Sequence, residues 1–272
     1  MHADFWRQLG LIASFEWLRL FHTKRGWLSL GTLVVIWYFI IRYLVLQTSD
    51  YLQQDIGMYL AGLGAEFGLQ GMDQWQVPEL SLFWILGLMI FPVFAMLMSA
   101  DQTSTDRARG SLRFLSLHTT RERIVLGRAL GHALMQIALV VTALLAVWLS
   151  STLQDNTKLI PSLPMLPVLV LNLSVFVLPY IAMMCFFSSI TQSARSALLL
   201  AFLWLVIMSA VLGYLESSFP FVLGIRNLIP GTQFYNLVIT PGWESPQQLV
   251  LPLVQTLGFM SLAIISIKRS AL

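Results

Sequence analysis

Six apolar runs, each about as long as a lipid bilayer is thick, constrain the fold of this chain more than any other feature. A helix of about twenty apolar residues crosses the roughly 30 Å hydrocarbon core of a bilayer. Within that core, only helices and closed barrels satisfy all of their own backbone hydrogen-bonding groups. We therefore predict an all-α polytopic membrane protein with six transmembrane helices in a single domain, residues 1–272. The predicted spans cover residues 27–46, 80–100, 129–149, 163–187, 197–215 and 249–267.

The composition agrees with a membrane protein and argues against binding to nucleic acid. Hydrophobic residues make up 57% of the chain and charged residues 11%, whereas soluble domains contain about 25% charged residues. The formal net charge of +3 is spread over short loops instead of being gathered on one surface. Membrane topology explains that distribution better than a nucleic-acid partner does.

Charged residues are divided unequally between the two sets of loops. The segment 101–128 contains six arginines, whereas the segment 47–79 contains five acids and no Lys or Arg. Basic residues near span ends resist translocation, so we expect the first segment in the cytoplasm and the second outside. With both termini inside, thirteen basic residues fall on the cytoplasmic side and three on the exterior side or its margin. Arg42 is one of these three, and we expect it to snorkel outward, with substrate contact as the alternative.

Two further segments are helical but are not expected to cross the bilayer. Residues 4–21 place apolar side chains at three- and four-residue spacing, which predicts an amphipathic helix lying at the membrane interface. Residues 219–228 are apolar but too short to span, and Pro230 and Gly231 break the pattern after them. We predict short re-entrant exterior helices between the fifth and sixth spans, with their backbone covered by protein.

The third span carries two patterns on different faces. Gly127 and Gly131 form a pair of small residues that would let another helix approach closely. Arg128, His132 and Gln136 follow one another at spacing four and form a polar stripe. The stripe is interpreted either as packing between helices or as the lining of a transport path.

The sequence lacks the motifs of the common hydrolases and nucleotide-binding proteins. It contains no HExxH, no GxSxG and no GxxxxGK[ST] motif, and its four histidines have no metal-ligand spacing. Cys185 is the only cysteine, which excludes an intrachain disulfide. We therefore predict no catalytic residue, no metal site and no cofactor in this chain. Any ATP-driven activity would require a separate subunit.

The charged segment resembles a loop of the permease subunits of type-2 ATP-binding-cassette (ABC) exporters. The similar stretch is TDRARGSLRFLSLHTTRERIVLGRAL, residues 105–130, and a weaker likeness covers NLIPGTQFYNLV, residues 227–238. The chain departs from the family pattern at Ser111, at Arg113 and at the pair His118–Thr119. Positions that match it are Asp106, Arg109, Gly110, Leu112, Leu115, Gly127 and Arg128.

The resemblance implies that residues 106–117 form a coupling helix seated in a groove of an ABC ATP-binding subunit. That subunit would hold the ATP and magnesium, and a second permease chain would complete a homodimer or heterodimer in the bacterial inner membrane. The residues themselves agree, because Asp106 and Arg109 can pair at spacing three, Gly110 permits close approach, and Leu112 and Leu115 offer an apolar anchor.

Several alternatives stay open at this point. The loop can instead lie on anionic lipid as a solvated basic segment. The chain can be an ion-coupled secondary transporter or a structural scaffold, although its spans contain few ionisable residues. Within the ABC interpretation, ATP hydrolysis can drive export of a substrate or mechanical work on an envelope or periplasmic partner.

Overall fold

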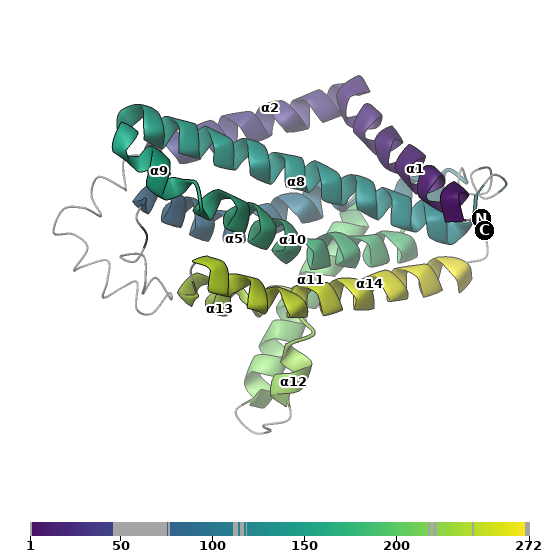
Figure 1. The fold of residues 1–272 in the computed structure, drawn as a ribbon. Helices are drawn as coiled ribbons and strands as arrows, with labels where there is room; N and C mark the ends of the chain where they lie inside the picture. The colour runs from purple at the N-terminus through teal and green to yellow at the C-terminus, as the bar shows by residue number, and fades with distance from the viewer. Residues whose placement is uncertain are drawn as a thin grey trace.

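The computed structural model describes residues 2–45, 75, 77–110, 114, 117, 119–216, 219, 222–240 and 242–269, and these residues contain helices and turns but no strand (Figure 1). The prediction of an all-α polytopic membrane protein is confirmed. The elements in chain order are α1 (His2–His22), α2 (Lys24–Phe39), π-helix η1 (Ile40–Val45), α5 (Pro78–Ser99), α6 (Ser104–Ala108), α8 (Arg121–Gln154), 3-10 helix η3 (Asn156–Lys158), α9 (Leu159–Ser162), α10 (Met165–Ile190), α11 (Ala194–Glu216), α12 (Val222–Arg226), α13 (Phe234–Ile239), 3-10 helix η4 (Gly242–Leu249) and α14 (Val250–Arg269).

Five stretches of the described chain are long and apolar enough to cross a membrane. They contain α5, α8, α10, α11 and α14. The remaining predicted span, residues 27–46, corresponds to α2 and η1, whose apolar stretch Val34–Tyr43 is shorter. Most of the predicted exterior segment 47–79 lies outside the described residues.

The helix α8 begins eight residues before its predicted span 129–149, within the predicted cytoplasmic segment 101–128. Its 34 residues begin at Arg121 and end at Gln154. At 1.5 Å per residue the helix is about 51 Å long, which exceeds the roughly 30 Å of the hydrocarbon core. The polar turns from Arg121 to Arg128 are therefore a helical extension beyond the apolar part of the span.

The helix α10 forms the centre of the bundle. Its apolar window is 78% buried, against 11% for α11, and it packs on α5, α8, α11 and α14. Gly87 of α5 permits one close approach, because a Cβ at this position would lie 3.1 Å from Leu173 Cδ2 of α10. In Figure 1, α11 leaves the bundle and carries α12 at its far end.

The helix α1 runs beside the first half of α8, and α1 begins at the end of the bundle where α14 ends (Figure 1). A Cβ at Gly127 would lie 2.7 Å from Ile12 Cβ, and one at Gly131 would lie 3.2 Å from Ala13 Cα. The predicted close approach at this glycine pair is confirmed, and the approaching helix is α1. Leu9 and Ala13, expected on the membrane-facing side of α1, are buried instead. The location of α1 at the interface stays a prediction.

Short helices connect α11 to α14, as expected for the re-entrant segment. Side chains of the spans satisfy the irregular backbone: Gln255 Nε2 donates to the carbonyls of Asn227 at 2.7 Å and Ile229 at 2.9 Å. Trp84 Nε1 of α5 donates to the carbonyl of Leu237 at 3.2 Å. Non-helical backbone at membrane depth needs such protein cover, so these bonds are compatible with the predicted re-entrant segment, whose depth in the bilayer stays a prediction.

Candidate functional site

The turn between α5 and α6 leads into the predicted coupling segment, residues 106–117. The carboxylate of Asp101 organises it by accepting hydrogen bonds from Ser104 Oγ and from the backbone N–H of Thr105, both at 3.1 Å. An acceptor here satisfies donors in the first turn of α6, which have no partner within the helix. The turn is thus fixed by a residue close to the end of α5.

The helix α6 ends at Ala108, and Gly110 follows two residues later, so the prediction of one continuous helix over residues 106–117 is wrong. Gly110 has φ +70°, a left-handed conformation that favours glycine and commonly ends helices. A Cβ on Gly110 would meet nothing within 4 Å in this chain. Within this chain, the left-handed backbone conformation is therefore the reason for a glycine at position 110. That Gly110 also leaves room for a partner subunit is a separate proposal.

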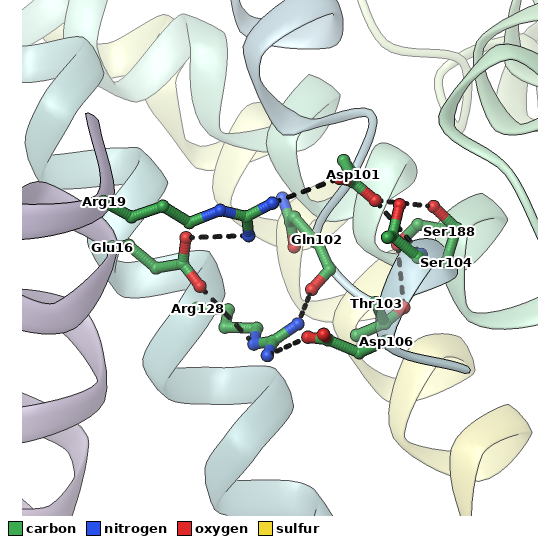
Figure 2. A network of polar contacts seen from close by, with 10 residues as sticks. Glu16, Arg19, Asp101, Gln102, Thr103, Ser104, Asp106, Arg128 and Ser188 are labelled. Carbon is green, nitrogen blue, oxygen red and sulfur yellow. Dashed lines mark hydrogen bonds and ion pairs between the residues drawn. The ribbon is translucent and has the colours of Figure 1, made fainter. Parts of the chain in front are cut away.

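Arg128 is the centre of a buried polar junction between three segments (Figure 2). Its side chain donates to Asp106 of α6 and to the carbonyl of Gln102, and its Nε lies 3.5 Å from Glu16 Oε1 of α1. Arg128 is 5% exposed and Glu16 is 4% exposed. A guanidinium can serve several acceptors at once because it presents five donors in a planar fork.

Glu16 and Arg19 extend this junction along α1. Arg19 lies 3.6 Å from Glu16 Oε2, and its Nη2 donates to Asp101 Oδ2 at 3.2 Å. Burial raises the pKa of Glu16, and the nearby Arg128 and Arg19 oppose that rise. Figure 2 shows the result, in which α1 holds both the turn after α5 and the start of α8.

Bonds to α10 complete the attachment of α6. Arg107 donates to the carbonyl of Ser189 near the end of α10, and Thr103 Oγ1 lies 3.0 Å from Ser188 Oγ. Gln102 Nε2 also donates to the carbonyl of Ile181 at 3.4 Å. A displacement of α6 would consequently act on α10 as well as on α1 and α8.

The structure brings together only part of the predicted coupling residues. Asp106 pairs with Arg128, whereas Arg109 is exposed and makes no ion pair with the described residues, so the expected pairing of Asp106 with Arg109 is wrong. The long helical extension of α8 brings Arg128 within reach of Asp106. Leu112 and Leu115 lie outside the described residues.

The polar stripe on α8 consists of Arg128, His132 and Gln136. Two of these residues make packing contacts, and no contact among the described residues explains the third, His132. Arg128 belongs to the polar junction, and Gln136 Nε2 donates to the carbonyl of Phe91 on α5 at 3.4 Å. The buried Nδ1 of His132 has no hydrogen-bond partner among the residues that the structure describes. The first two contacts favour the packing interpretation, and a transport path along the stripe stays a prediction.

Sequence reasoning missed Glu16, Arg19 and Gln102 as members of this site. Glu16 follows Ile12 by four residues and Ala13 by three, so an acid interrupts the apolar face of the N-terminal helix. That interruption was the available signal. The described residues contain no group of three or more His, Cys, Asp or Glu side chains that could hold a metal ion.

Comparison with known proteins gives one family. The sequence model described as "ABC-2 family transporter protein" matches residues 11–258, which is most of the chain. No curated protein matches the chain.

Proposed function

The chain belongs to the ABC-2 family of transporter proteins and is a membrane permease of this class, and on this premise we propose that it couples ATP hydrolysis by a separate subunit to movement of its spans. The work done is export of a substrate or mechanical action on an envelope or periplasmic partner. ATP and magnesium would bind to the partner subunit. The permease would contribute the coupling segment at residues 106–117.

The observation that carries this proposal is the polar junction at Arg128. Asp106 on α6 is joined to Arg128 on α8 and through it to Glu16 on α1, while Arg107 joins α6 to α10. A subunit that pushes on α6 would therefore act on three other helices through buried charge-assisted bonds. Such bonds are stronger than neutral ones and hold a defined geometry.

Exposed apolar surface supports a second permease chain. The helix α11 is the least buried of the five candidate spans. Its exposed side chains include Leu199, Phe202, Leu203, Val206 and Ile207. A homodimer or heterodimer would cover part of this face, and lipid would cover the rest.

The charge distribution supports an inner-membrane location with cytoplasmic termini. Basic residues gather on α1, on α6, and at the beginning of α8 and the end of α14, which lie toward one end of the bundle (Figure 1). This asymmetry follows the positive-inside rule. The α6 end would then face the cytoplasm, where an ATP-binding subunit is available.

An ion-coupled secondary transporter is the competing function. Such transporters use ionisable side chains deep within their spans. In the described spans, α10 contains no Asp, Glu, Lys, Arg or His, and the charged residues of α5, α11 and α14 lie at the helix ends. In α8 such residues occupy the first turns, and His132 is the last of them. This distribution favours an external energy source.

A matched pair of substitutions tests the coupling segment. Leu117 follows α6 and is 77% exposed, and Leu153 near the end of α8 is 75% exposed. We expect Leu117→Asp to weaken recovery of an ATP-hydrolysing subunit with the chain by at least tenfold, because an unpaired charge at an interface costs several kcal/mol. Leu153→Asp should leave recovery unchanged, since it lies at the opposite end of α8.

The readout is co-purification of ATPase activity from native membranes in mild detergent. Equal insertion of both variants, measured by their yield in the membrane fraction, is the control for folding. A wild-type chain that never recovers an ATPase, or a Leu117→Asp chain that recovers it fully with normal turnover, would contradict the proposal.

A further inference from the structure

An apolar groove runs along one side of the bundle, apart from the polar junction. It has a volume of about 560 Å³ and lies between α1, α2, η1, α5 and α8. Volumes of roughly 300–1,000 Å³ are typical of sites for small molecules. Two of the five candidate spans, α5 and α8, supply part of its lining, so we expect the groove to face lipid.

Two helical stripes form the walls of the groove. Residues of α2 and η1 that line it recur at three- and four-residue spacing: Val34, Trp37, Tyr38, Ile41 and Arg42. The facing stripe on α8 has the same spacing and includes Met135, Ala138, Leu139, Thr142, Ala146 and Ser150. Small side chains on α8 opposite aromatic ones on α2 leave the space unfilled.

The polar groups of α8 in this groove are already satisfied. Thr142 Oγ1 donates to the carbonyl of Ala138 at 2.8 Å, and Ser150 Oγ donates to that of Ala146 at 2.7 Å. Neither hydroxyl needs a hydrogen-bond acceptor from a ligand. The α8 wall therefore offers a surface suited to hydrocarbon.

Arg42 is the one charged residue that lines the groove, and it has no ion-pair or hydrogen-bond partner for its side chain among the described residues. It lies in η1, and π-helical segments often occur at functional sites. A guanidinium binds phosphate through a planar, bidentate fork. Within the described part of the chain, the groove thus combines a hydrocarbon-like wall with a cation that has no partner there.

We propose that this groove binds an anionic phospholipid of the surrounding bilayer, with an acyl chain along α8 and the phosphate at Arg42. A second copy of the chain fits less well, because an interface over this groove would bury Arg42, and the described residues that line the groove include no acid to pair with it. The site is independent of the coupling function. It assigns Arg42, which sequence analysis left between snorkelling and substrate contact, to recognition of a lipid headgroup.

The test uses the full chain reconstituted in vesicles of phosphatidylcholine with a minor fraction of phosphatidylglycerol. After gentle extraction, native mass spectrometry counts each lipid that remains bound. We expect Arg42→Gln to lower the preference for phosphatidylglycerol by about tenfold, equivalent to about 1.4 kcal/mol. Arg42→Lys should retain most of the preference because it keeps the charge.

Filling the groove provides a second variant with a matched control. Ala146→Phe places a ring in the groove and should abolish retention of both lipids, whereas Leu145→Phe, at an exposed position of α8 that does not line the groove, should behave as wild type. Unchanged lipid retention in Arg42→Gln and Ala146→Phe would overturn the proposal. So would a change in oligomeric state without a change in bound lipid, because the groove would then be an interface between copies.

Discussion

Substitution of Arg128 by Met is the most direct perturbation of the polar junction. It removes the cation between Glu16 and Asp106 while keeping a long, apolar side chain. Glu16 is 4% exposed and its remaining cation, Arg19, lies 3.6 Å away, so one buried carboxylate would lose most of its compensation. Breaking one partner of a buried ion pair destabilises proteins by about 3–5 kcal/mol. We expect Arg128→Met to lower the free energy of unfolding by an amount in this range.

The double variant Glu16→Gln/Arg128→Met separates an ion pair from general packing. If the loss arises from the uncompensated carboxylate, neutralising Glu16 should recover part of it. The coupling energy of the cycle should then be at least about 1 kcal/mol, within the range found for residues in contact. Additive losses would refute the proposed interaction between these two residues.

The chain contains its own reporter for this measurement. Cys185 is the only cysteine, is fully buried on α10, and packs with Ile124 and Val125 of α8. Ala263 and Ile267 of α14 also pack in this cluster, so we expect a thiol-reactive fluorophore to label Cys185 only when α8 or α14 separates from α10. The temperature at which labelling accelerates should fall by several degrees in Arg128→Met and recover partly in the double variant.

The dependence on pH gives the same prediction a second test. The pKa of Glu16 is raised by burial in the folded chain, and loss of Arg128 removes an influence that lowers it. A carboxyl with a raised folded pKa binds protons more tightly in the folded state, so stability rises as the pH falls toward the ordinary Glu value of 4.5. The difference in stability between wild type and Arg128→Met should become smaller on acidification. A difference that grows would contradict the proposed role of Glu16.

Two other contacts give predictions with the same labelling assay. Gly127→Leu should displace α1, because even a Cβ at this position would lie 2.7 Å from Ile12 Cβ. Overpacking of this kind lowers the free energy of unfolding by about 1–3 kcal/mol. The control Gly10→Ala, with nothing within 4 Å of the added Cβ, should not destabilise the chain. Gln255→Leu should lower the labelling temperature, because it leaves the carbonyls of Asn227 and Ile229 without their donor, which costs about 1–3 kcal/mol of stability. Ser261→Ala removes a hydrogen bond within its own helix and should have little effect. Equal labelling temperatures for the two variants would refute the role of Gln255 in holding this segment.

The sequence could predict the spans because their signal is local. Hydrophobic runs such as 80–100 and 197–215 give elements within a few residues of α5 and α11, since length and composition alone decide whether a segment can cross lipid. The glycine pair on α8 was also predictable, because its spacing marks a close contact on one helix. Which helix fills that contact depends on tertiary structure.

The partners of the charged residues could not be predicted from spacing. Asp106 and Arg109 would be neighbours on a continuous helix, but α6 ends at Ala108, before Arg109, and Arg128 reaches Asp106 from another element. A contact over 22 residues depends on where α8 begins, and helix boundaries inside a charged segment are weakly marked. The sequence shows Glu16 as an acid that interrupts an apolar face, but it does not show that Arg19 and Arg128 are the partners of this acid.

The ion pair between Glu16 and Arg128 has a consequence for biosynthesis. The two residues are separated by about 110 positions, so at roughly 5–20 residues per second Arg128 leaves the ribosome some 6–22 s after Glu16. During this interval α1 exists without the helix on which it packs. Its outward side chains Trp6, Leu11, Phe15 and Leu18 are exposed, and we expect them to give the nascent segment a lipid anchor. Ribosome-bound chains truncated before Arg128 should therefore carry α1 in a detachable, protease-sensitive state that disappears once α8 has emerged.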